Sequence, residues 1–292
     1  LRIHCMTIDG LEGASSPRVG SKTIGFAYNA KAAYLLRKLS AAADFKWIYL
    51  VQEDESVFHA NSSIASLIRY SYDFPCLPVF NGDIMMRYMQ QRYGMPETDA
   101  IFFEHQYILP SRDVYMAEKD KVLVCYFRPE HHACRNCHEI IALSIERCLT
   151  ISDSLMDWEI VGVGALTECQ IPLPRGKEIT CMPKMDYASY SALLRRASVG
   201  ISLMDAPHPS VVPFEMAGHG ITTITNSYFN RTQQEIVDLA PGNTIRICKL
   251  NHESLAEVID GVVTDWNSVK AADYAALDSC LAFAETDALS LR

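Results

Sequence analysis

Two arginines in the middle of the chain have the side chains and the spacing that bind phosphate groups. Arg128 and Arg135 lie in the segment Tyr-Phe-Arg-Pro-Glu-His-His-Ala-Cys-Arg-Asn-Cys-His at residues 126–138. An apolar run just before this segment predicts a strand, and the segment leads into a helix predicted at residues 136–149. Two guanidinium groups beside the unpaired N–H groups of a helix N-terminus suit a diphosphate. On spacing alone, exposed arginines that make weak ion pairs are an equal alternative.

A carboxylate in the segment 200–226 is the second candidate for ligand binding. The short apolar run at residues 199–204 predicts a buried parallel strand, and the prolines after it exclude helix as far as Pro213. Pro213 suits the first position of a helix, which places Glu215 in the first turn, beside the positive end of the dipole. Ligands of open parallel sheets bind outside the carboxyl ends of the strands, where this loop begins. The residues leave two roles open for Glu215, a ligand contact and a carboxylate that only complements the dipole.

Further polar groups occur in the same two segments. His208 and Ser210 lie in the proline-rich loop, where a His-Pro-Ser sequence can donate hydrogen bonds to a phosphate or a sugar. Cys134 and Cys137 form a Cys-x-x-Cys pair beside histidines, and these are residue types that bind zinc. A structural zinc site needs a second pair at a recognisable distance, and the other cysteines and histidines show no such spacing. We therefore expect no metal site.

The two segments resemble those of a known class of enzymes. Pro-Phe-Glu-Met-Ala-Gly-His-Gly, which contains Glu215, is similar to the nucleotide-binding segment of GT-B glycosyltransferases. The longer pattern Ser-Leu-Met-x-x-Pro-His-Pro-Ser-x-x-Pro-x-Glu-Met-Ala resembles the rhamnosyltransferases of surface-glycan and rhamnan synthesis, which also carry Tyr-x-Arg-Pro followed by Arg-Asn. The resemblance implies that Arg128, Arg135 and Asn136 bind a diphosphate and that Glu215 accepts hydrogen bonds from ribose hydroxyls. Where retaining GT-B enzymes carry an earlier glutamate, this chain has Pro207, so the resemblance leaves inversion and retention open.

The resemblance also assigns residues to the base of the nucleotide. In GT-B enzymes the loop that corresponds to residues 183–187 contacts the base, which implies contacts from the backbone near Met182 and Lys184 and from Tyr187. From the residues alone, packing in the core is the alternative for this tyrosine. Gly164 ends a predicted strand, where a glycine permits close approach of a ligand.

An acidic turn follows a predicted strand in the first part of the chain. The sequence Gln-Glu-Asp-Glu-Ser-Val-Phe at residues 52–58 resembles the family segment Gln-Asp-x-Glu-Pro-x-Phe, with Glu53 in place of the family's Asp and Ser56 in place of its Pro. The resemblance implies that Glu53 or Glu55 orients the acceptor hydroxyl or acts on it as a base. A solvated acidic turn is the alternative.

Length and composition predict a globular protein. The chain has 292 residues, 49% of them hydrophobic, and a net charge of −9, which argues against a nucleic-acid partner. No apolar run approaches the roughly 20 residues that span a bilayer, and the first residues lack the pattern of a secretion signal. The ten cysteines are irregularly spaced, as expected of reduced thiols. We expect a cytoplasmic protein, free or at the membrane surface.

Strand and helix patterns alternate along the chain, which predicts an α/β fold of two Rossmann-like domains with a deep cleft between them. We predict an acceptor-side domain at residues 1–117, a nucleotide-sugar domain at residues 118–267, and a helical segment at residues 268–292 that packs back on the first domain or caps the second sheet. The first domain has only about four strand patterns, fewer than a nucleotide-type sheet of about six. We therefore expect it to be incomplete, with residues 10–20 as the place of the missing part. Its strands are predicted at residues 2–8, 23–27, 47–51 and 77–80.

Together these features predict a glycosyltransferase that moves a sugar such as rhamnose from a nucleotide-diphosphate donor to a glycan acceptor. Arg128, Arg135 and His208 would stabilise the leaving diphosphate, and the absence of an Asp-x-Asp motif predicts a reaction without a metal ion. Two alternatives stay open, a sugar-nucleotide epimerase on the same fold and a catalytically silent sugar-nucleotide-binding module. The expected assembly is a homodimer or a part of a larger multidomain synthase.

Overall fold

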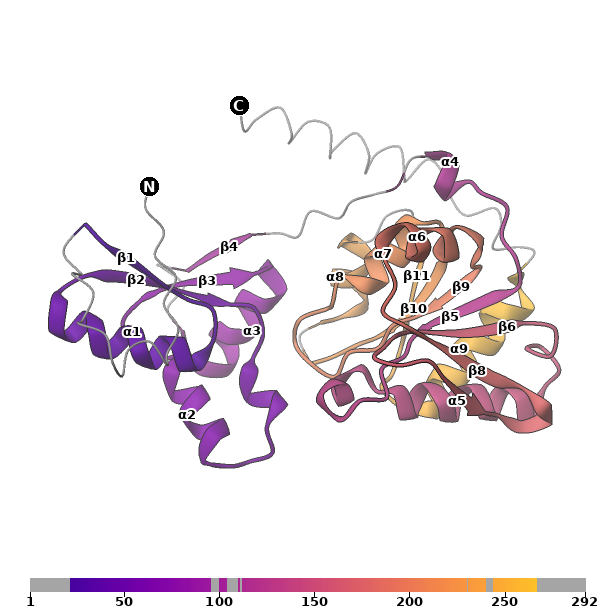
Figure 1. Ribbon diagram of the computed structural model, residues 1–292, viewed down its shortest axis with the longest axis horizontal. Coiled ribbons are helices and arrows are strands. Elements are labelled where there is room, and N and C mark those ends of the chain that lie inside the picture. Colours follow the sequence, from indigo (N-terminus) through magenta and orange to yellow (C-terminus); the bar gives the residue numbers. More distant parts are fainter. Residues whose placement is uncertain are drawn as a thin grey trace. The chain divides into compact units, whose positions relative to one another are not determined.

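The computed structural model describes residues 22–95, 100–103, 110, 112–229, 231–239 and 244–266 (Figure 1). The chain divides into two compact units, Leu1–Phe103 and Glu104–Arg292. The boundary expected from the sequence lies later, after residue 117. The strand expected at residues 2–8, the missing part expected at residues 10–20 and the segment at residues 268–292 lie outside the described residues.

The first unit is built on a parallel sheet of four described strands in the order β1-β2-β3-β4. In β2, Trp47, Tyr49 and Val51 are buried and alternate with more exposed residues, which is the period of two that a strand requires. Asn29 and Ser62 begin α1 and α2 by accepting hydrogen bonds from N–H groups of the first turns. The described elements are β1 (Ile24–Ala27), α1 (Ala30–Ala43), β2 (Lys46–Val51), η2 (Glu55–Phe58), α2 (Ser63–Ser71), β3 (Leu77–Asn81), α3 (Asp83–Tyr93) and β4 (Ile101–Phe103).

Three of the strands predicted for this unit are present as β1, β2 and β3. The fourth described strand, Ile101–Phe103, is not predicted by the sequence. It has only 3 residues, fewer than the runs of about four to eight from which a strand is recognised in a sequence, and all of them are exposed.

The second unit is built on a sheet of seven described strands in the order β11-β10-β9-β5-β6-β8-β7. Six strands are parallel, and β7 pairs with β8 in the antiparallel direction at the edge. Without β7, the strands follow the order 3-2-1-4-5-6 of a doubly wound sheet, whose order reverses between β5 and β9. The strands are β5 (Val122–Tyr126), β6 (Glu159–Ala165), β7 (Cys169–Pro172), β8 (Glu178–Pro183), β9 (Val199–Ile201), β10 (Thr222–Asn226) and β11 (Ile245–Cys248).

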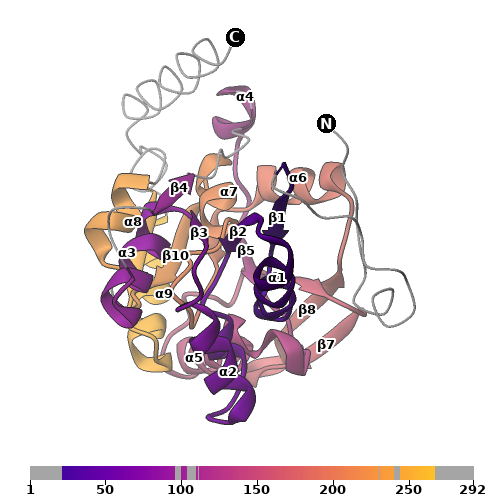
Figure 2. The ribbon, with the colours of Figure 1, turned by 90° about the vertical axis from the view of Figure 1, so that its left-hand side faces the viewer.

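Helices cover both faces of this sheet (Figures 1 and 2). On one face, Ile141 and Ile145 of α5 and Ile259 of α9 pack into one hydrophobic core with the strands. On the other face, Leu194 of α6 and Met216 of α7 pack into a second core. The helical segments of this unit are α4 (Arg112–Tyr115), η3 (His131–Asn136), α5 (His138–Ile151), η4 (Pro174–Gly176), α6 (Tyr187–Arg196), α7 (Val212–Gly218), α8 (Gln233–Leu239) and α9 (His252–Thr264).

Within the part of the chain that the structure describes, every helix is too short or too polar to cross a bilayer. The predicted α/β fold with parallel sheets is confirmed in both units. The cleft between them concerns their relative placement and stays a prediction.

Candidate functional site

The point where the strand order of the second unit reverses brings together the two segments that the sequence singled out. The chain leaves β5 into η3, which carries Arg135 and Asn136, and leaves β9 into the proline-rich loop. The N–H group of Asp205 in that loop donates a hydrogen bond to the carbonyl oxygen of Arg135 (2.8 Å). The side-chain amide of Asn136 contacts the sulfur of Met204, with 4.0 Å between Nδ2 and Sδ. Such reversal points are the places where doubly wound sheets bind their ligands.

Arg128 is held at the end of β5 by two side chains. Its Nη1 donates to the hydroxyl of Tyr126 (3.4 Å), and its Nη2 lies 3.0 Å from Nε2 of His132. Because a guanidinium has no acceptor, His132 accepts this bond at Nε2 and carries its proton on Nδ1. The guanidinium carbon lies 5.9 Å from the centre of the Tyr126 ring, a cation–π distance. Arg128 thus places a fixed positive charge at the carboxyl edge of the sheet.

Gly164, at the end of β6, makes room for this arrangement. Its φ of +95° lies in a region that side chains rarely adopt, and an added Cβ would approach a ring carbon of Tyr126 to 2.8 Å and Cγ of Arg128 to 3.3 Å. The structure therefore gives Gly164 a definite role, which is to let Tyr126 pack beneath Arg128.

A carboxylate ties the loop after β6 to the loop after β5. Glu130 accepts a hydrogen bond at Oε1 from the backbone N–H of Leu166. Desolvation raises the pKa of Glu130, but this hydrogen bond and the charge of Arg128 lower it by more, so the pKa lies below its ordinary value. Glu130 is therefore ionised at neutral pH and partly balances the positive charge beside it.

The N-terminus of α5 adds unpaired donors to the same edge. The helix begins after Cys137, whose φ is 54°, and the N-cap side chain makes no hydrogen bond to the first turn. Asn136, just before it, is 1% exposed, and its Oδ1 accepts no hydrogen bond from the described residues. Backbone N–H groups at a helix start, with the positive end of the dipole behind them, are suited to bind an anion.

A buried arginine fixes the proline-rich loop. Arg231 is 1% exposed, and its guanidinium donates to the carbonyl oxygens of Met204 (2.8 Å), Ala206 (3.2 Å), His208 (3.0 Å) and Asn226 (3.1 Å). This arginine is not identifiable from the sequence, because its partners lie up to 27 residues away.

The side chain of Asn226 binds the same loop from the end of β10. Its Oδ1 accepts a hydrogen bond from the N–H group of Met204 (2.8 Å), and its Nδ2 donates to the carbonyl oxygen of Met204 (3.1 Å). Because this amide satisfies both backbone groups of one residue, it sets the direction in which the loop leaves β9.

His208 and Ser210, the two donors predicted in this loop, are joined by a local turn. The N–H group of Ser210 donates to Nδ1 of His208 (3.0 Å), and Ser210 has a φ of 66°. Because Nδ1 accepts this bond, the neutral form of His208 carries its proton on Nε2. His208 therefore has Nε2–H as the ring group that can donate to an anion.

Glu215 lies in the first turn of α7, where the sequence places it. Its carboxylate is half-buried and accepts no hydrogen bond from the residues that the structure describes. Burial raises the pKa of Glu215 above its ordinary value. A desolvated carboxylate without a donor is costly in the free protein and is well suited to accept hydrogen bonds from a ligand.

A hydrogen bond between His219, at the end of α7, and Ser191 of α6 supports α7, and the sequence does not predict it. Nδ1 of His219 lies 2.7 Å from the carbonyl oxygen of Glu215, and its Nε2 lies 3.0 Å from the hydroxyl of Ser191 in α6. A carbonyl only accepts, so the ring donates from Nδ1 and accepts from Ser191 at Nε2. Burial lowers the pKa of His219, which keeps it in this neutral form. The i, i+4 spacing of Glu215 and His219 is the only signal of this support in the sequence.

The residues predicted to contact a base lie at the end of β8 on the same edge of the sheet. The N–H group of Lys184 donates to the carbonyl oxygen of Ala165, which joins the ends of β8 and β6 (3.0 Å). Met182 is half-buried against the second core. Tyr187 is 59% exposed, which excludes core packing as its role.

In the first unit, the acidic turn after β2 is more ordered than a solvated turn. Glu55 accepts a hydrogen bond at Oε2 from the N–H group of Ala30, the first residue of α1 (3.1 Å), and burial raises its pKa. Oε1 of Glu53 accepts a hydrogen bond from the N–H group of Asp54 (3.0 Å). Both glutamates therefore lie at the carboxyl end of β2, and Glu55 also caps α1.

Asp54, which the sequence did not single out, is the buried carboxylate of this turn. It is 1% exposed and accepts hydrogen bonds from the hydroxyls of Tyr93 (2.6 Å), Tyr88 (3.3 Å) and Tyr72 (3.4 Å) and from the N–H group of Ser56 (3.0 Å). Four donors around one carboxylate compensate for its desolvation. Asp54 thus holds the turn that carries the two glutamates.

No group of three or more metal-binding side chains occurs within residues 22–95 and the other described ranges. Of the Cys-x-x-Cys pair, Cys134 is exposed and Cys137 is buried, with its Sγ 3.3 Å from the carbonyl oxygen of Arg135. Among the described residues, the two thiols are therefore not grouped with further side chains that could complete a metal site.

Comparison with known proteins places this geometry in a fold class. Residues 121–260 match the family described as WsaF, C-terminal domain. No curated protein sequence matches the chain significantly. The chain is similar to the solved structure of sucrose-phosphate synthase (tll1590) from Thermosynechococcus elongatus, with a TM-score of 0.58 and 12% identity over 92% of this chain and 74% of that one.

Two further structures show the same likeness. Anabaena Alr3699/HepE in complex with UDP and glucose gives a TM-score of 0.60 and 12% identity over 92% of this chain and 78% of that one. WaaG, a glycosyltransferase involved in lipopolysaccharide biosynthesis, gives a TM-score of 0.54 and 12% identity over 82% of this chain and 76% of that one. The fold is that of the GT-B glycosyltransferases, as the sequence predicts.

Proposed function

We propose that this chain is a glycosyltransferase that transfers a sugar from a nucleoside-diphosphate donor to a glycan acceptor. The observation that carries the proposal is the main-chain hydrogen bond between Asp205 and Arg135 (2.8 Å), which joins the two loops at the reversal point of the sheet. Around it lie a fixed arginine, an uncapped helix N-terminus and an unpartnered carboxylate. The cationic groups at this edge of the sheet suit the diphosphate of a nucleoside diphosphate, and the carboxylate suits the hydroxyl groups of its ribose.

Each group has a proposed task in the transfer. Arg128 and Arg135, with the N-terminus of α5 and Nε2–H of His208, stabilise the negative charge that develops on the leaving diphosphate. These groups supply the charge stabilisation that a divalent metal gives in other enzymes, and we propose that the reaction needs no metal ion. Glu215 accepts hydrogen bonds from the ribose hydroxyls. The identity of the donor nucleotide is proposed as UDP, because Alr3699/HepE binds UDP on the same fold.

The remaining predicted residues complete the donor site. Asn136 and Ser210 add polar contacts to the diphosphate and the sugar, and Gly164 leaves space beside them. The backbone near Met182 and Lys184 and the ring of Tyr187 contact the base. We propose rhamnose as the transferred sugar, on the sequence resemblance of the proline-rich loop to rhamnosyltransferases.

The acceptor hydroxyl is assigned to the first unit. Glu55 is the proposed base, with Glu53 beside it, because burial raises the pKa of Glu55 and a base is more effective when its pKa lies nearer the working pH. Activity assays with different glycans would identify the acceptor and the linkage that is formed.

A titration of the full chain with UDP, other nucleoside diphosphates and their sugars tests the proposal. Binding to the native state raises the melting temperature, and calorimetry gives the affinity. Arg128→Ala is expected to weaken UDP binding by about 10- to 100-fold, the effect of a lost charge-assisted hydrogen bond. Arg195→Ala, an exposed arginine on α6, is the matched control and should leave the affinity unchanged. Equal affinities of the two variants would refute the diphosphate site.

The products distinguish the proposal from its two alternatives. Transfer that requires a glycan acceptor and continues in EDTA supports a metal-independent glycosyltransferase. Conversion of the donor sugar without an acceptor would identify an epimerase. Tight UDP binding without any turnover would identify a silent binding module.

A further inference from the structure

The helix pair α1 and α2 of the first unit presents an apolar stripe to solvent. Ile64, Leu67 and Tyr70 recur every three residues along α2 and are 56%, 53% and 51% exposed. A helix of a globular domain buries such a stripe against a neighbour, but α2 buries Ala65 and Ile68 instead. Three contiguous, half-exposed apolar side chains form a patch of the kind that binds another surface.

The residues around this stripe are basic. The helices α1 and α2 contain four basic residues, Lys31, Arg37, Lys38 and Arg69, and no acidic residue. The whole chain has a net charge of −9, so this concentration of positive charge is opposite to the charge of the protein. The acids that follow the two helices, Asp44 and Asp73, lie beyond their ends. The partner of this face is therefore expected to be anionic.

The two helices form one rigid face. The hydroxyl of Tyr34 donates to the carbonyl oxygen of Leu67 (3.0 Å), which connects α1 to the middle of the stripe. The guanidinium of Arg37 lies over the rings of Phe74 (4.1 Å to the centroid) and Tyr70 (5.4 Å). Basic and apolar groups are thus fixed side by side rather than scattered on the surface.

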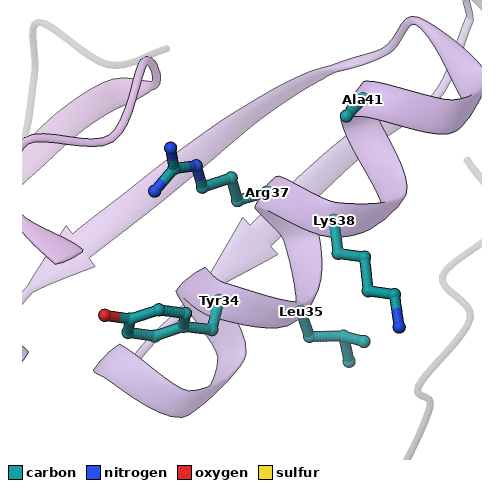
Figure 3. A pocket seen from close by; sticks show the side chains of 5 residues that line it. All are labelled: Tyr34, Leu35, Arg37, Lys38 and Ala41. Carbon is teal, nitrogen blue, oxygen red and sulfur yellow. The ribbon is translucent and has the colours of Figure 1, made fainter. Parts of the chain in front are cut away.

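A shallow, open depression lies along α1 beside this face. It has a volume of about 570 Å³ and is lined by Tyr34, Leu35, Arg37, Lys38 and Ala41 of α1 (Figure 3). Its position along the middle of a helix separates it from the strand ends that carry the candidate donor site, and none of the residues proposed for catalysis lines it.

We propose that the α1–α2 face binds an anionic membrane surface. Ile64, Leu67 and Tyr70 enter the boundary between headgroups and acyl chains, and Lys31 and Lys38 contact lipid phosphates. Amphipathic faces of this kind bind membranes through the sum of buried apolar area and attraction to anionic lipid. The proposal concerns the first unit and does not depend on the activity proposed above.

Co-sedimentation of the full chain with vesicles tests this proposal. The chain should bind vesicles of phosphatidylcholine with a quarter phosphatidylglycerol and should not bind vesicles of phosphatidylcholine alone. Leu67→Asp should weaken binding about tenfold or more, because it replaces an inserted side chain by a charge that anionic lipid repels. Replacing Lys31 and Lys38 by alanine should weaken binding about fivefold for each charge. Circular dichroism establishes that each variant is folded.

Matched variants in the second unit serve as controls. Leu143→Asp changes an exposed leucine of α5 (49% exposed), and Lys249→Ala removes an exposed lysine; both should bind like the wild type. Equal binding to both kinds of vesicle, no binding to either, or equal effects of Leu67→Asp and Leu143→Asp would overturn the proposal. A dimer in sedimentation velocity that Leu67→Asp converts to a monomer would overturn it in favour of a second copy of this chain.

Discussion

Replacing Arg231 with methionine tests how the proline-rich loop of the second unit is held. Methionine is unbranched like the aliphatic part of the arginine side chain, but it lacks the guanidinium that donates to four carbonyl oxygens. Met204 keeps a donor, because the Asn226 amide also bonds to its carbonyl oxygen (3.1 Å). The carbonyl groups of Ala206, His208 and Asn226 lose the donor that the structure gives them.

The expected loss of stability follows from these three groups. A buried carbonyl without a donor costs about 1–3 kcal/mol, so three cost about 3–9 kcal/mol. Removing a buried charge also removes its desolvation penalty, which offsets part of this loss. We expect Arg231→Met to lower the free energy of unfolding of the second unit by about 2–4 kcal/mol. Arg231→Lys keeps the charge but has a single nitrogen that reaches fewer carbonyl oxygens, and we expect an intermediate loss.

Urea unfolding, followed by the fluorescence of the buried Trp158, measures this free energy. Arg195→Met, which changes an exposed arginine of α6, is the control and should change the free energy of unfolding by no more than about 0.5 kcal/mol. The affinity for UDP should fall with Arg231→Met as well, because the loop carries His208. A loss below about 1 kcal/mol with unchanged UDP affinity would show that the guanidinium does not hold the loop.

Three further substitutions have expected outcomes. Burial raises the pKa of Glu215, so the stability that it contributes is present below its ordinary pKa and is lost as the pH rises through the folded value. Glu215→Gln should therefore gain stability over the wild type with rising pH, and in calorimetry it should bind UDP more weakly than the wild type at pH 7, with an affinity that does not fall in acid as that of the wild type does. Glu253→Gln, in the first turn of α9, should show neither effect. Gly164→Ala should cost about 2–3 kcal/mol in urea unfolding, since a Cβ would meet a ring carbon at 2.8 Å at a φ of +95°, whereas Gly261→Ala in α9, where nothing lies within 4 Å, should gain up to about 1 kcal/mol. Asp54→Ala should lower the free energy of unfolding of the first unit by about 3–5 kcal/mol, because it leaves four hydrogen-bond donors unpaired. Unfolding followed by tyrosine fluorescence measures this loss, and a loss below about 1 kcal/mol would contradict the assigned network.

The sequence predicts the strands whose apolar runs are long and the residues that lie directly after them. Val122–Tyr126 and Val199–Ile201 follow from uninterrupted apolar residues, and Arg128 and Glu215 follow from their positions beyond these strands. The alternation of residue types predicts which side chains are buried within a strand, but not within a turn. It therefore does not predict which of the three acids after β2 is buried, and the structure shows that it is Asp54.

Long-range support is the part that the sequence does not reveal. Arg231 is a single arginine in a polar stretch, and only the fold brings it to carbonyl groups as far back as Met204. The same holds for the contact between His219 and Ser191, which joins α7 to α6. Hydrogen bonds to backbone carbonyls leave no pattern of residue types at the acceptor, so these partners are recognisable only in three dimensions.

The main-chain hydrogen bond between Asp205 and Arg135 has a consequence for the thermodynamics of ligand binding. It joins the loop after β5 to the loop after β9, so both loops are already ordered when the second unit has folded. A ligand that enters this edge of the sheet meets backbone that is already fixed, and little conformational entropy is lost on binding. Association at this site should therefore have a small unfavourable entropy of ordering, and the amide proton of Asp205 should exchange slowly with solvent before any ligand is added.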